Sequence, residues 1–480
     1  MSDLKNKTVT GMIWSAVERF STQGVQFLFG VVLARLLTPA DYGVIAMLTI
    51  FLMVSQTFID SGFGNALIRK IDRTEKDKST VFFFNIFMAI ICYAIIFFAA
   101  PFIAVFYGMP ELSLILRVLA LRLIIQSFST IQTINLTIQL NFKKQAKISL
   151  SSAILSGFFG IYFAYNGYGV WALVYQALFG TTLSAILYWS IAKWRPTSFF
   201  SKDSFHYLFG YGSKLLASGL LDTIYSNIYP LVIGKFYAPA QLGGFSKAQS
   251  FAAFPSSNVT GILQRVSFPV LSAMQKDQER LRNGYLKFID AATLLIFPLM
   301  MGLLALSKPL TLFFLTDKWS GMIILLQLLC LSMMWYPVHA INLNLLQVLG
   351  RSDLFLKLEI IKKILGVGVL CATLPFGLVT MCIGKIFSAW ICLFINTYYS
   401  GKFLHAGFAV QMKFLLPTFF NSLIMAAIIL GINALLPESE HLLQLGIGFC
   451  IGIIYYFGSN YLFNREKILE LKTVFKRKQQ

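Results

Sequence analysis

LLTPADYG, residues Leu36–Gly43, ends the first long apolar run of this 480-residue sequence, and FYAPAQLG, residues Phe236–Gly243, ends another run 200 residues later. Proline cannot donate a backbone hydrogen bond and glycine tolerates tight turns, so both residues occur where one helix stops and the next reverses direction. A simple hairpin explains either copy alone. The recurrence of the same turn predicts a duplicated fold.

The composition is that of a membrane protein. Apolar residues make up 57% of the chain and charged residues 12%, whereas soluble proteins have about 45–50% and about 25%. Apolar runs of roughly 18 or more residues are long enough to cross a bilayer as helices. About fourteen such runs predict an all-α integral membrane protein. They are Gly11–Leu36, Tyr42–Ile68, Val81–Tyr107, Leu112–Leu140, Ile148–Tyr165, Val170–Ala192, Tyr207–Phe236, Leu242–Val266, Tyr285–Ser307, Met322–Leu349, Leu354–Phe376, Leu378–Tyr399, Phe414–Leu436 and His441–Phe463.

The net charge of +20 is distributed unevenly between alternate loops. If the N-terminus is cytoplasmic, the basic segments Arg69–Lys78 and Lys193–Lys214 and the tail Arg465–Lys478 share one side, while the opposite loops carry few basic residues. This asymmetry follows the positive-inside rule. The basicity therefore predicts a topology with both termini in the cytoplasm and contact with the lipid bilayer, and no nucleic-acid partner.

Further identities share the register of the repeated turn. At the offset of 200, Lys76-Asp77 matches Lys276-Asp277, and at an offset of 210 Tyr188 matches Tyr398. Six spans are an even number, so the second copy enters the membrane from the same face as the first. The halves are then parallel repeats with a substrate path at their interface. The predicted domains are a six-helix lobe over residues 1–200, a second over 201–402, and two extra helices with a basic tail over 403–480.

Ionisable groups at membrane depth are costly and tend to face a protein interior or a water-filled cavity. Asp222 corresponds to Thr22 at the offset of 200, and Thr22 lies one helical turn from Glu18. The first helix of each half is therefore predicted to carry a carboxylate, Glu18 in one and Asp222 in the other, on the corresponding face of the helix. The candidates for the substrate cavity are Glu18, Arg19, Gln23, Gln26, Arg122, Asp222, Asn227 and Lys247, followed by Arg35, Asp60 and Lys385. Because basic groups predominate at depth, the predicted cavity is cationic and suits an anionic solute such as a phosphate.

Structural roles are the alternative for these side chains. Glu18 and Arg19 can pair with other helices, and Arg35 can extend to the lipid headgroups from the end of its helix. Lys385 can neutralise a buried acid. The sequence alone leaves both readings open.

No pattern indicates enzyme chemistry or a cofactor. The six cysteines and four histidines lack metal-ligand spacing, and no Walker A motif is present. No connection between runs exceeds roughly 25 residues, which leaves little room for a soluble catalytic domain. We therefore predict no catalytic residue, no metal and no cofactor, and no direct use of ATP.

Three segments carry a resemblance to a known family: ARLLTPADYGVIAM (Ala34–Met47), DSGFGNALIRK (Asp60–Lys70) and SFPVLSAMQKDQERLRNGYLK (Ser267–Lys287). They resemble the bacterial polysaccharide-export flippases, the Wzx-type members of the multidrug/oligosaccharidyl-lipid/polysaccharide exporter superfamily. The resemblance covers essentially the whole chain, including the number of runs. Its motifs specify the family more closely than they specify the cargo.

The resemblance implies a V-shaped pair of lobes in the bacterial inner membrane. It implies movement of an undecaprenyl-pyrophosphate-linked oligosaccharide from the cytoplasmic to the periplasmic leaflet by alternating access, coupled to H⁺ or Na⁺. A polysaccharide polymerase and a chain-length regulator are the implied downstream partners. The pathway, whether lipopolysaccharide O-antigen, capsule or exopolysaccharide, stays open.

Two other functions compete with this prediction. A multidrug or cation antiporter of the same superfamily would carry a cationic cargo, and the excess of basic groups at depth argues against it. A membrane enzyme of polysaccharide synthesis would need paired catalytic carboxylates or a His-Asp constellation. The sequence shows neither arrangement, so the flippase is the preferred prediction.

Overall fold

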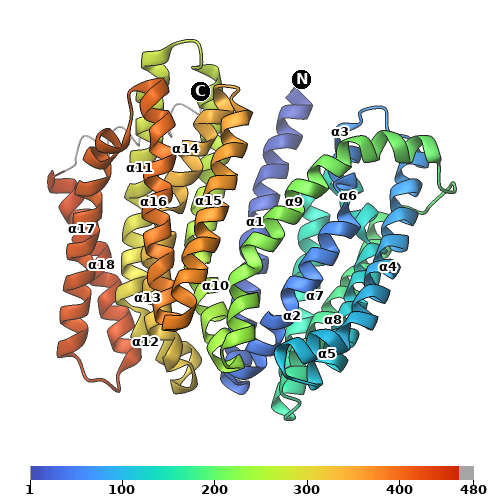
Figure 1. Cartoon of the computed structure of the whole chain (residues 1–480), viewed down its shortest axis with the longest axis horizontal. Coiled ribbons are helices and arrows are strands. Elements are labelled where there is room, and N and C mark those ends of the chain that lie inside the picture. The colour runs from blue at the N-terminus through green and yellow to red at the C-terminus, as the bar shows by residue number, and fades with distance from the viewer. Residues whose placement is uncertain (1, 464–480) are drawn as a thin grey trace. The chain divides into compact units, whose positions relative to one another are not determined.

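The computed structural model describes the backbone of residues 2–463 and the side chains of residues 14–462. All elements in this part of the chain are helices, which confirms the predicted all-α class (Figure 1). By their internal contacts the residues group into two compact units, Met1–Gly243 and Gly244–Gln480. This grouping reflects packing and does not test the predicted domain boundaries at residues 200 and 402. The basic tail Arg465–Lys478 lies outside the described residues.

The helices follow one another with short connections. The first unit holds α1 (Ser2–Leu36), α2 (Pro39–Asp60), α3 (Phe63–Arg69), α4 (Glu75–Tyr107), α5 (Glu111–Ser127), α6 (Thr130–Ile138), α7 (Phe142–Tyr165), α8 (Val170–Ala192) and α9 (Lys202–Phe236). Then come α10 (Pro239–Ala273), α11 (Gln278–Ala305), α12 (Ser307–Leu315), α13 (Ile323–Met333), α14 (Tyr336–Val348), α15 (Ser352–Thr373), α16 (Leu378–Leu404), α17 (Phe408–Leu435) and α18 (His441–Phe463). Short 3-10 helices cover Asp317–Met322 and Leu374–Phe376.

The helices correspond to the predicted apolar runs. Among the described residues, nine helical segments are long and apolar enough to cross a membrane, and the bent pair of α5 and α6 makes a tenth. The long helices α1, α9, α10 and α15 cover the four remaining predicted runs but contain more polar residues and are not among these segments. The protein is a multi-pass membrane protein.

Three runs predicted to be continuous are broken. Tyr42–Ile68 divides into α2 and α3 at Ser61 and Gly62, whose φ angles of 41° and 69° lie in the left-handed region. Leu112–Leu140 bends by 42° between α5 and α6, and Met322–Leu349 divides into α13 and α14. Average hydropathy over a window does not detect one or two residues that leave the helical conformation. Leu112–Leu140 and Met322–Leu349 are the fourth spans of the two predicted halves. Both are broken near the middle, as expected of a repeat.

The repeated turn begins a helix in both copies, although the capping chemistry differs. In the first copy the Thr38 side chain accepts a hydrogen bond from the Asp41 backbone N–H at 3.3 Å, and Asp41 Oδ2 accepts one from the Thr38 N–H at 2.8 Å. These two bonds form a capping box. In the second copy the Gln241 side chain accepts from the Ala238 backbone N–H at 3.2 Å. The residue in the third helical position therefore caps both helices.

The two turns also contact each other. A Cβ added to Gly43 would overlap the carbonyl oxygen of Pro239 and lie 2.6 Å from its carbonyl carbon. A Cβ added to Gly243 would overlap the carbonyl oxygen of Pro39 and lie 2.8 Å from its carbonyl carbon. The two contacts are reciprocal, because each glycine lies against the backbone of the proline that begins the helix of the other turn.

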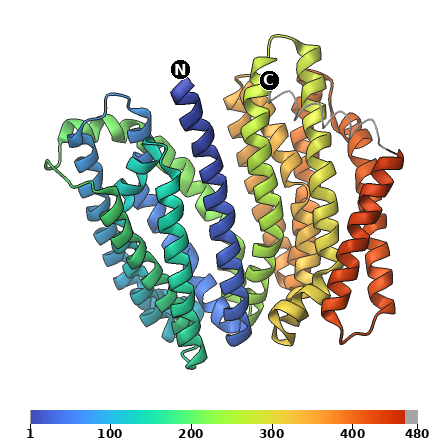
Figure 2. The same cartoon turned by 180° about the vertical axis from the view of Figure 1, so that it is seen from behind.

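In the first unit α1 packs along α7, and α7 packs along α8 (Figure 2). Glycines permit this close approach, because a Cβ at Gly157 of α7 would overlap the ring of Phe29 on α1. A Cβ at Gly180 of α8 would lie 3.0 Å from the Cβ of Ser156 on α7. These three helices form one wall of the cavity described next.

Candidate functional site

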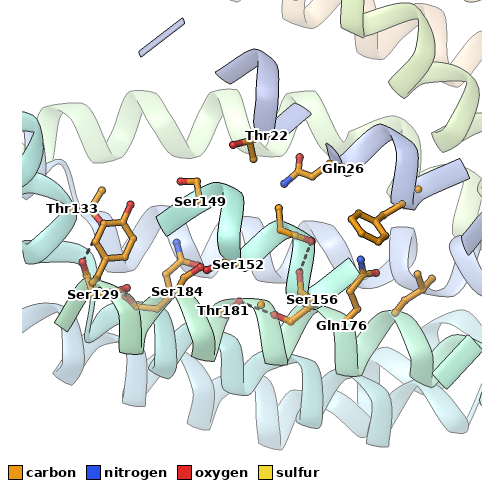
Figure 3. A pocket seen from close by; sticks show the side chains of 18 of the residues that line it. Thr22, Gln26, Ser129, Thr133, Ser149, Ser152, Ser156, Gln176, Thr181 and Ser184 are labelled. Atoms are coloured by element: carbon orange, nitrogen blue, oxygen red, sulfur yellow. Dashed lines mark hydrogen bonds between the residues drawn. The ribbon is translucent and has the colours of Figure 1, made fainter. Parts of the chain in front are cut away.

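A cavity of about 720 Å³ lies inside the first unit (Figure 3). Its volume falls within the about 300–1,000 Å³ that is typical of small-molecule sites. Uncharged polar side chains from several helices are the most numerous of its lining residues, which also include apolar ones. The polar side chains of the lining are those of Thr22, Gln26, Tyr42, Asp60, Gln126, Ser129, Thr130, Thr133, Ser149, Ser152, Ser156, Gln176, Thr181, Ser184 and Tyr188.

The polar residues recur at helical spacing. On α7 the lining residues Ser149, Ser152 and Ser156 are three and four positions apart, and on α1 Thr22 and Gln26 are four apart. Residues at this spacing share one face of a helix. Each helix therefore presents a narrow polar stripe to the cavity, and the labelled side chains of these stripes lie around the same space in Figure 3.

Several of the hydroxyl groups bond to their own helix. The hydroxyl of Thr133 donates to the Ser129 carbonyl at 3.1 Å, that of Ser156 to the Ala153 carbonyl at 3.3 Å, and that of Thr181 to the Ala177 carbonyl at 2.8 Å. Because the proton is used within the helix, the oxygen can accept a hydrogen bond from a molecule in the cavity.

Two further hydroxyl oxygens have unused bonding capacity. Thr22 Oγ1 and Ser152 Oγ are buried and have no hydrogen-bond partner among the described residues. Buried polar atoms are normally paired, and an unpaired one commonly marks a place for water or a ligand. Both residues line the cavity, one on α1 and the other on α7.

The cavity is close to neutral. Asp60 is the one charged side chain among the lining residues, and its Oδ1 accepts a hydrogen bond from Gln56 Nε2 at 2.9 Å. Asp60 and Gln26 are the two exposed polar side chains among these lining residues. The lining supplies both donors and acceptors of hydrogen bonds, and over residues 14–462 it contains no lysine, arginine or histidine.

Three of the predicted site residues belong to this cavity or touch it. Gln26 and Asp60 line it. Glu18 is half-buried beside it, and its Oε1 accepts a hydrogen bond from the lining residue Ser149 at 3.0 Å. This bond joins α1 to α7, which is the interhelical role that the sequence left open as an alternative.

The structure places the other predicted residues away from the cavity lining. Arg19, Arg35 and Asp222 are exposed, whereas Gln23, Arg122, Asn227, Lys247 and Lys385 are half-buried. Asn227 Nδ2 donates to the Thr223 carbonyl of its own helix at 2.8 Å. The ammonium groups of the two lysines lie near aromatic rings, that of Lys247 at 5.8 Å from the ring centre of Trp319 and that of Lys385 at 5.4 Å from the ring centre of Phe245. None of the basic candidates lines the cavity of the first unit. The predicted cationic cavity between the repeats stays a prediction.

Sequence reasoning missed most of the hydroxyl-bearing residues. It ranked positions by the cost of burying charge, and serine and threonine carry none. The usable signal was spacing, because Gln176, Gly180, Ser184 and Tyr188 recur every four residues through an otherwise apolar helix. Such a stripe of small and uncharged polar residues indicates a helix face turned away from lipid.

Comparisons with known proteins agree with the fold and the motifs. The chain is 25% identical over 356 residues to the teichuronic acid biosynthesis protein TuaB of Bacillus subtilis, which covers 74% of each chain. It is 24% identical over 372 residues to the lipopolysaccharide biosynthesis protein WzxC of Escherichia coli, covering 75% of this chain and 74% of that protein. It is 26% identical over 327 residues to the succinoglycan biosynthesis transport protein ExoT of Rhizobium meliloti, covering 68% of this chain and 66% of that protein.

Solved structures share the fold at low sequence identity. The lipid II flippase MurJ in an inward closed conformation has a TM-score of 0.73 at 16% identity, with 94% of this chain and 99% of that chain covered. A family model described as "Polysaccharide biosynthesis protein" matches residues 32–324, more than half of the sequence. This match confirms the family resemblance drawn from the motifs. The chain belongs to the polysaccharide biosynthesis protein family.

Proposed function

We propose that the protein is a flippase for lipid-linked oligosaccharides. It moves an undecaprenyl-pyrophosphate-linked repeat unit from the cytoplasmic to the periplasmic leaflet of the bacterial inner membrane by alternating access. The single observation that carries the proposal is a large cavity lined by uncharged hydrogen-bonding groups inside a unit of membrane helices. Membership of the polysaccharide biosynthesis protein family supports it.

The physical task fits such a cavity. A sugar head group cannot enter hydrocarbon without losing its hydrogen bonds to water, and each unreplaced bond costs several kcal/mol. Hydroxyl and amide side chains replace those bonds while the lipid tail remains in the bilayer. Transport of this kind needs no covalent chemistry, and we propose that the protein is not an enzyme.

Further features of the proposal come from the sequence. Both termini are cytoplasmic according to the distribution of basic residues. In the absence of a nucleotide-binding motif, a gradient of H⁺ or Na⁺ drives the cycle, and a polymerase and a chain-length regulator receive the product. The relatives named for teichuronic acid, lipopolysaccharide and succinoglycan synthesis support a polysaccharide cargo without fixing which one.

Depletion of the protein tests the proposal directly. We expect lipid-linked repeat units to accumulate on the cytoplasmic leaflet, because no other path carries the head group through the hydrocarbon. A membrane-impermeant sugar-labelling reagent applied to spheroplasts measures the fraction on the outer leaflet, and a plasmid-borne copy should restore it. If lipid-linked repeat units reached the outer leaflet of depleted cells at the normal rate, the protein would not be the flippase. Increased sensitivity to cationic drugs with normal sugar export would favour the antiporter.

A further inference from the structure

We infer that the cavity of the first unit is a binding site for the uncharged sugar rings of the cargo, and that it does not bind the pyrophosphate. The inference rests on the proposed function and assigns one part of the cargo to one set of side chains. It departs from the expectation of a cationic cavity that receives sugar and phosphate together.

Charge is the first argument. Pyrophosphate sites in proteins use arginine, lysine or backbone N–H groups at helix termini. Among the described residues, the lining contains no basic side chain, and its one charged group is the carboxylate of Asp60, which repels phosphate. Sugar hydroxyls both donate and accept hydrogen bonds, and serine, threonine, glutamine and aspartate side chains match that requirement.

The bonding of the hydroxyls is the second argument. Serine and threonine in membrane proteins often hold helices together by hydrogen bonds between helices. Here Thr133, Ser156 and Thr181 donate to carbonyls of their own segments. Ser149 does join α7 to α1 through Glu18. The hydroxyl protons of Thr133, Ser156 and Thr181, however, are not used in bonds between α1, α7 and α8, so these stripe residues are available for a different use. The unpaired oxygens of Thr22 and Ser152 indicate that this use is an occupant with hydrogen-bonding groups of its own.

The position of the stripes is the third argument. Ser152 and Thr181 project from neighbouring helices into one space, and Gln176, five residues before Thr181 on α8, also lines it (Figure 3). An occupant therefore meets polar groups on more than one side, as a sugar ring with hydroxyls around its edge requires. A lipid tail would leave all of these groups without partners, at a cost for each.

Neighbouring residues of α8 supply a matched test. Thr181 lines the cavity and Thr182 does not, yet each hydroxyl donates to the carbonyl four residues earlier at 2.8 Å. The variant Thr181→Val removes a hydroxyl from the cavity, and Thr182→Val removes one from outside it. Valine is close to threonine in shape, so both variants keep the packing. On α7 the pair Ser152→Ala and Ser151→Ala offers the same comparison, because Ser151 is exposed and lies outside the lining.

The measurement is equilibrium dialysis of the purified full-length protein in lipid nanodiscs. The two probes are the oligosaccharide repeat unit of the host's polysaccharide, freed of lipid and phosphate, and undecaprenyl pyrophosphate without sugar. We expect Thr181→Val and Ser152→Ala each to weaken oligosaccharide binding roughly two- to tenfold, the equivalent of one hydrogen bond. Binding of undecaprenyl pyrophosphate should not change, and the Thr182→Val and Ser151→Ala controls should bind both probes normally.

Three results would overturn the inference: no binding of the free oligosaccharide to the wild-type protein, equal affinities in cavity and control variants, or weakened binding of undecaprenyl pyrophosphate in the cavity variants. Each can occur in a protein that flips lipid-linked oligosaccharides normally in the depletion experiment. Conversely, a protein that binds the free oligosaccharide through Thr181 and Ser152 but does not flip it would refute the proposed function and keep the site. The sugar-binding site and the flippase function can therefore be refuted independently of each other.

Discussion

Gly43→Ala is expected to destabilise the protein by about 3 kcal/mol or more, which is the upper end of the range for overpacking. The added methyl group would overlap the backbone carbonyl of Pro239. A clash with a flexible side chain can relax by rotation, but a carbonyl at the start of α10 cannot move without shifting that helix. The second copy of the turn predicts the same result for Gly243→Ala, because its methyl group would overlap the carbonyl of Pro39.

The matched control for these variants is Gly24→Ala on α1, where an added Cβ has no atom within 4 Å. Alanine has the higher helix propensity, so this control should retain or slightly increase stability, by up to about 1 kcal/mol. Thermal unfolding of the detergent-purified variants, together with their yield from membranes, measures the difference. Wild-type unfolding temperatures for both turn variants would show that the close contact of the two turns does not stabilise the fold.

The contact between the turns illustrates what the sequence could predict. Pro39 and Gly43 recur at Pro239 and Gly243, and this recurrence was sufficient to predict a duplication and the position of a helix start in each copy. Long apolar runs were sufficient to predict the helices, because the cost of unpaired backbone groups in lipid leaves few alternatives. That the two copies touch each other could not be predicted, since contact between distant segments depends on packing and not on local pattern.

The candidate site was predicted less well than the fold. Charge at membrane depth identified Asp60 and, through its contact with Ser149, Glu18. It missed Ser152 and Thr181, because a single hydroxyl in an apolar helix is common and can be satisfied by its own backbone. Only the assembly of α1, α7 and α8 shows that such residues face one space. The breaks in three spans were missed for a related reason, because each involves only a few residues and leaves the average hydropathy unchanged; left-handed residues occur at one of them, Ser61 and Gly62.

A second large effect is expected in the second unit, where a buried hydrogen-bond network joins four helices. Gln411 on α17 is completely buried, and its Nε2 lies 2.8 Å from Tyr285 Oη on α11 and 2.9 Å from Ser400 Oγ on α16. Its Oε1 accepts a hydrogen bond from Asn342 Nδ2 on α14 at 3.1 Å. Tyr285 Oη in turn donates to Asn342 Oδ1 at 2.7 Å. One amide therefore supplies partners to polar groups on three other helices.

Gln411→Leu keeps most of the side-chain volume and removes the amide, so it tests the hydrogen bonds separately from the packing. We expect a loss of about 2–4 kcal/mol, because several buried groups lose a partner at once, although single bonds between membrane helices are individually weak. Gln278→Leu is the control, since its Nε2 donates to the Phe403 carbonyl at an exposed position of the same unit. Removing one exposed bond should cost no more than about 1 kcal/mol. Chemical denaturation of the two variants in detergent measures both losses, and equal losses would mean that the buried network contributes no more than a surface contact.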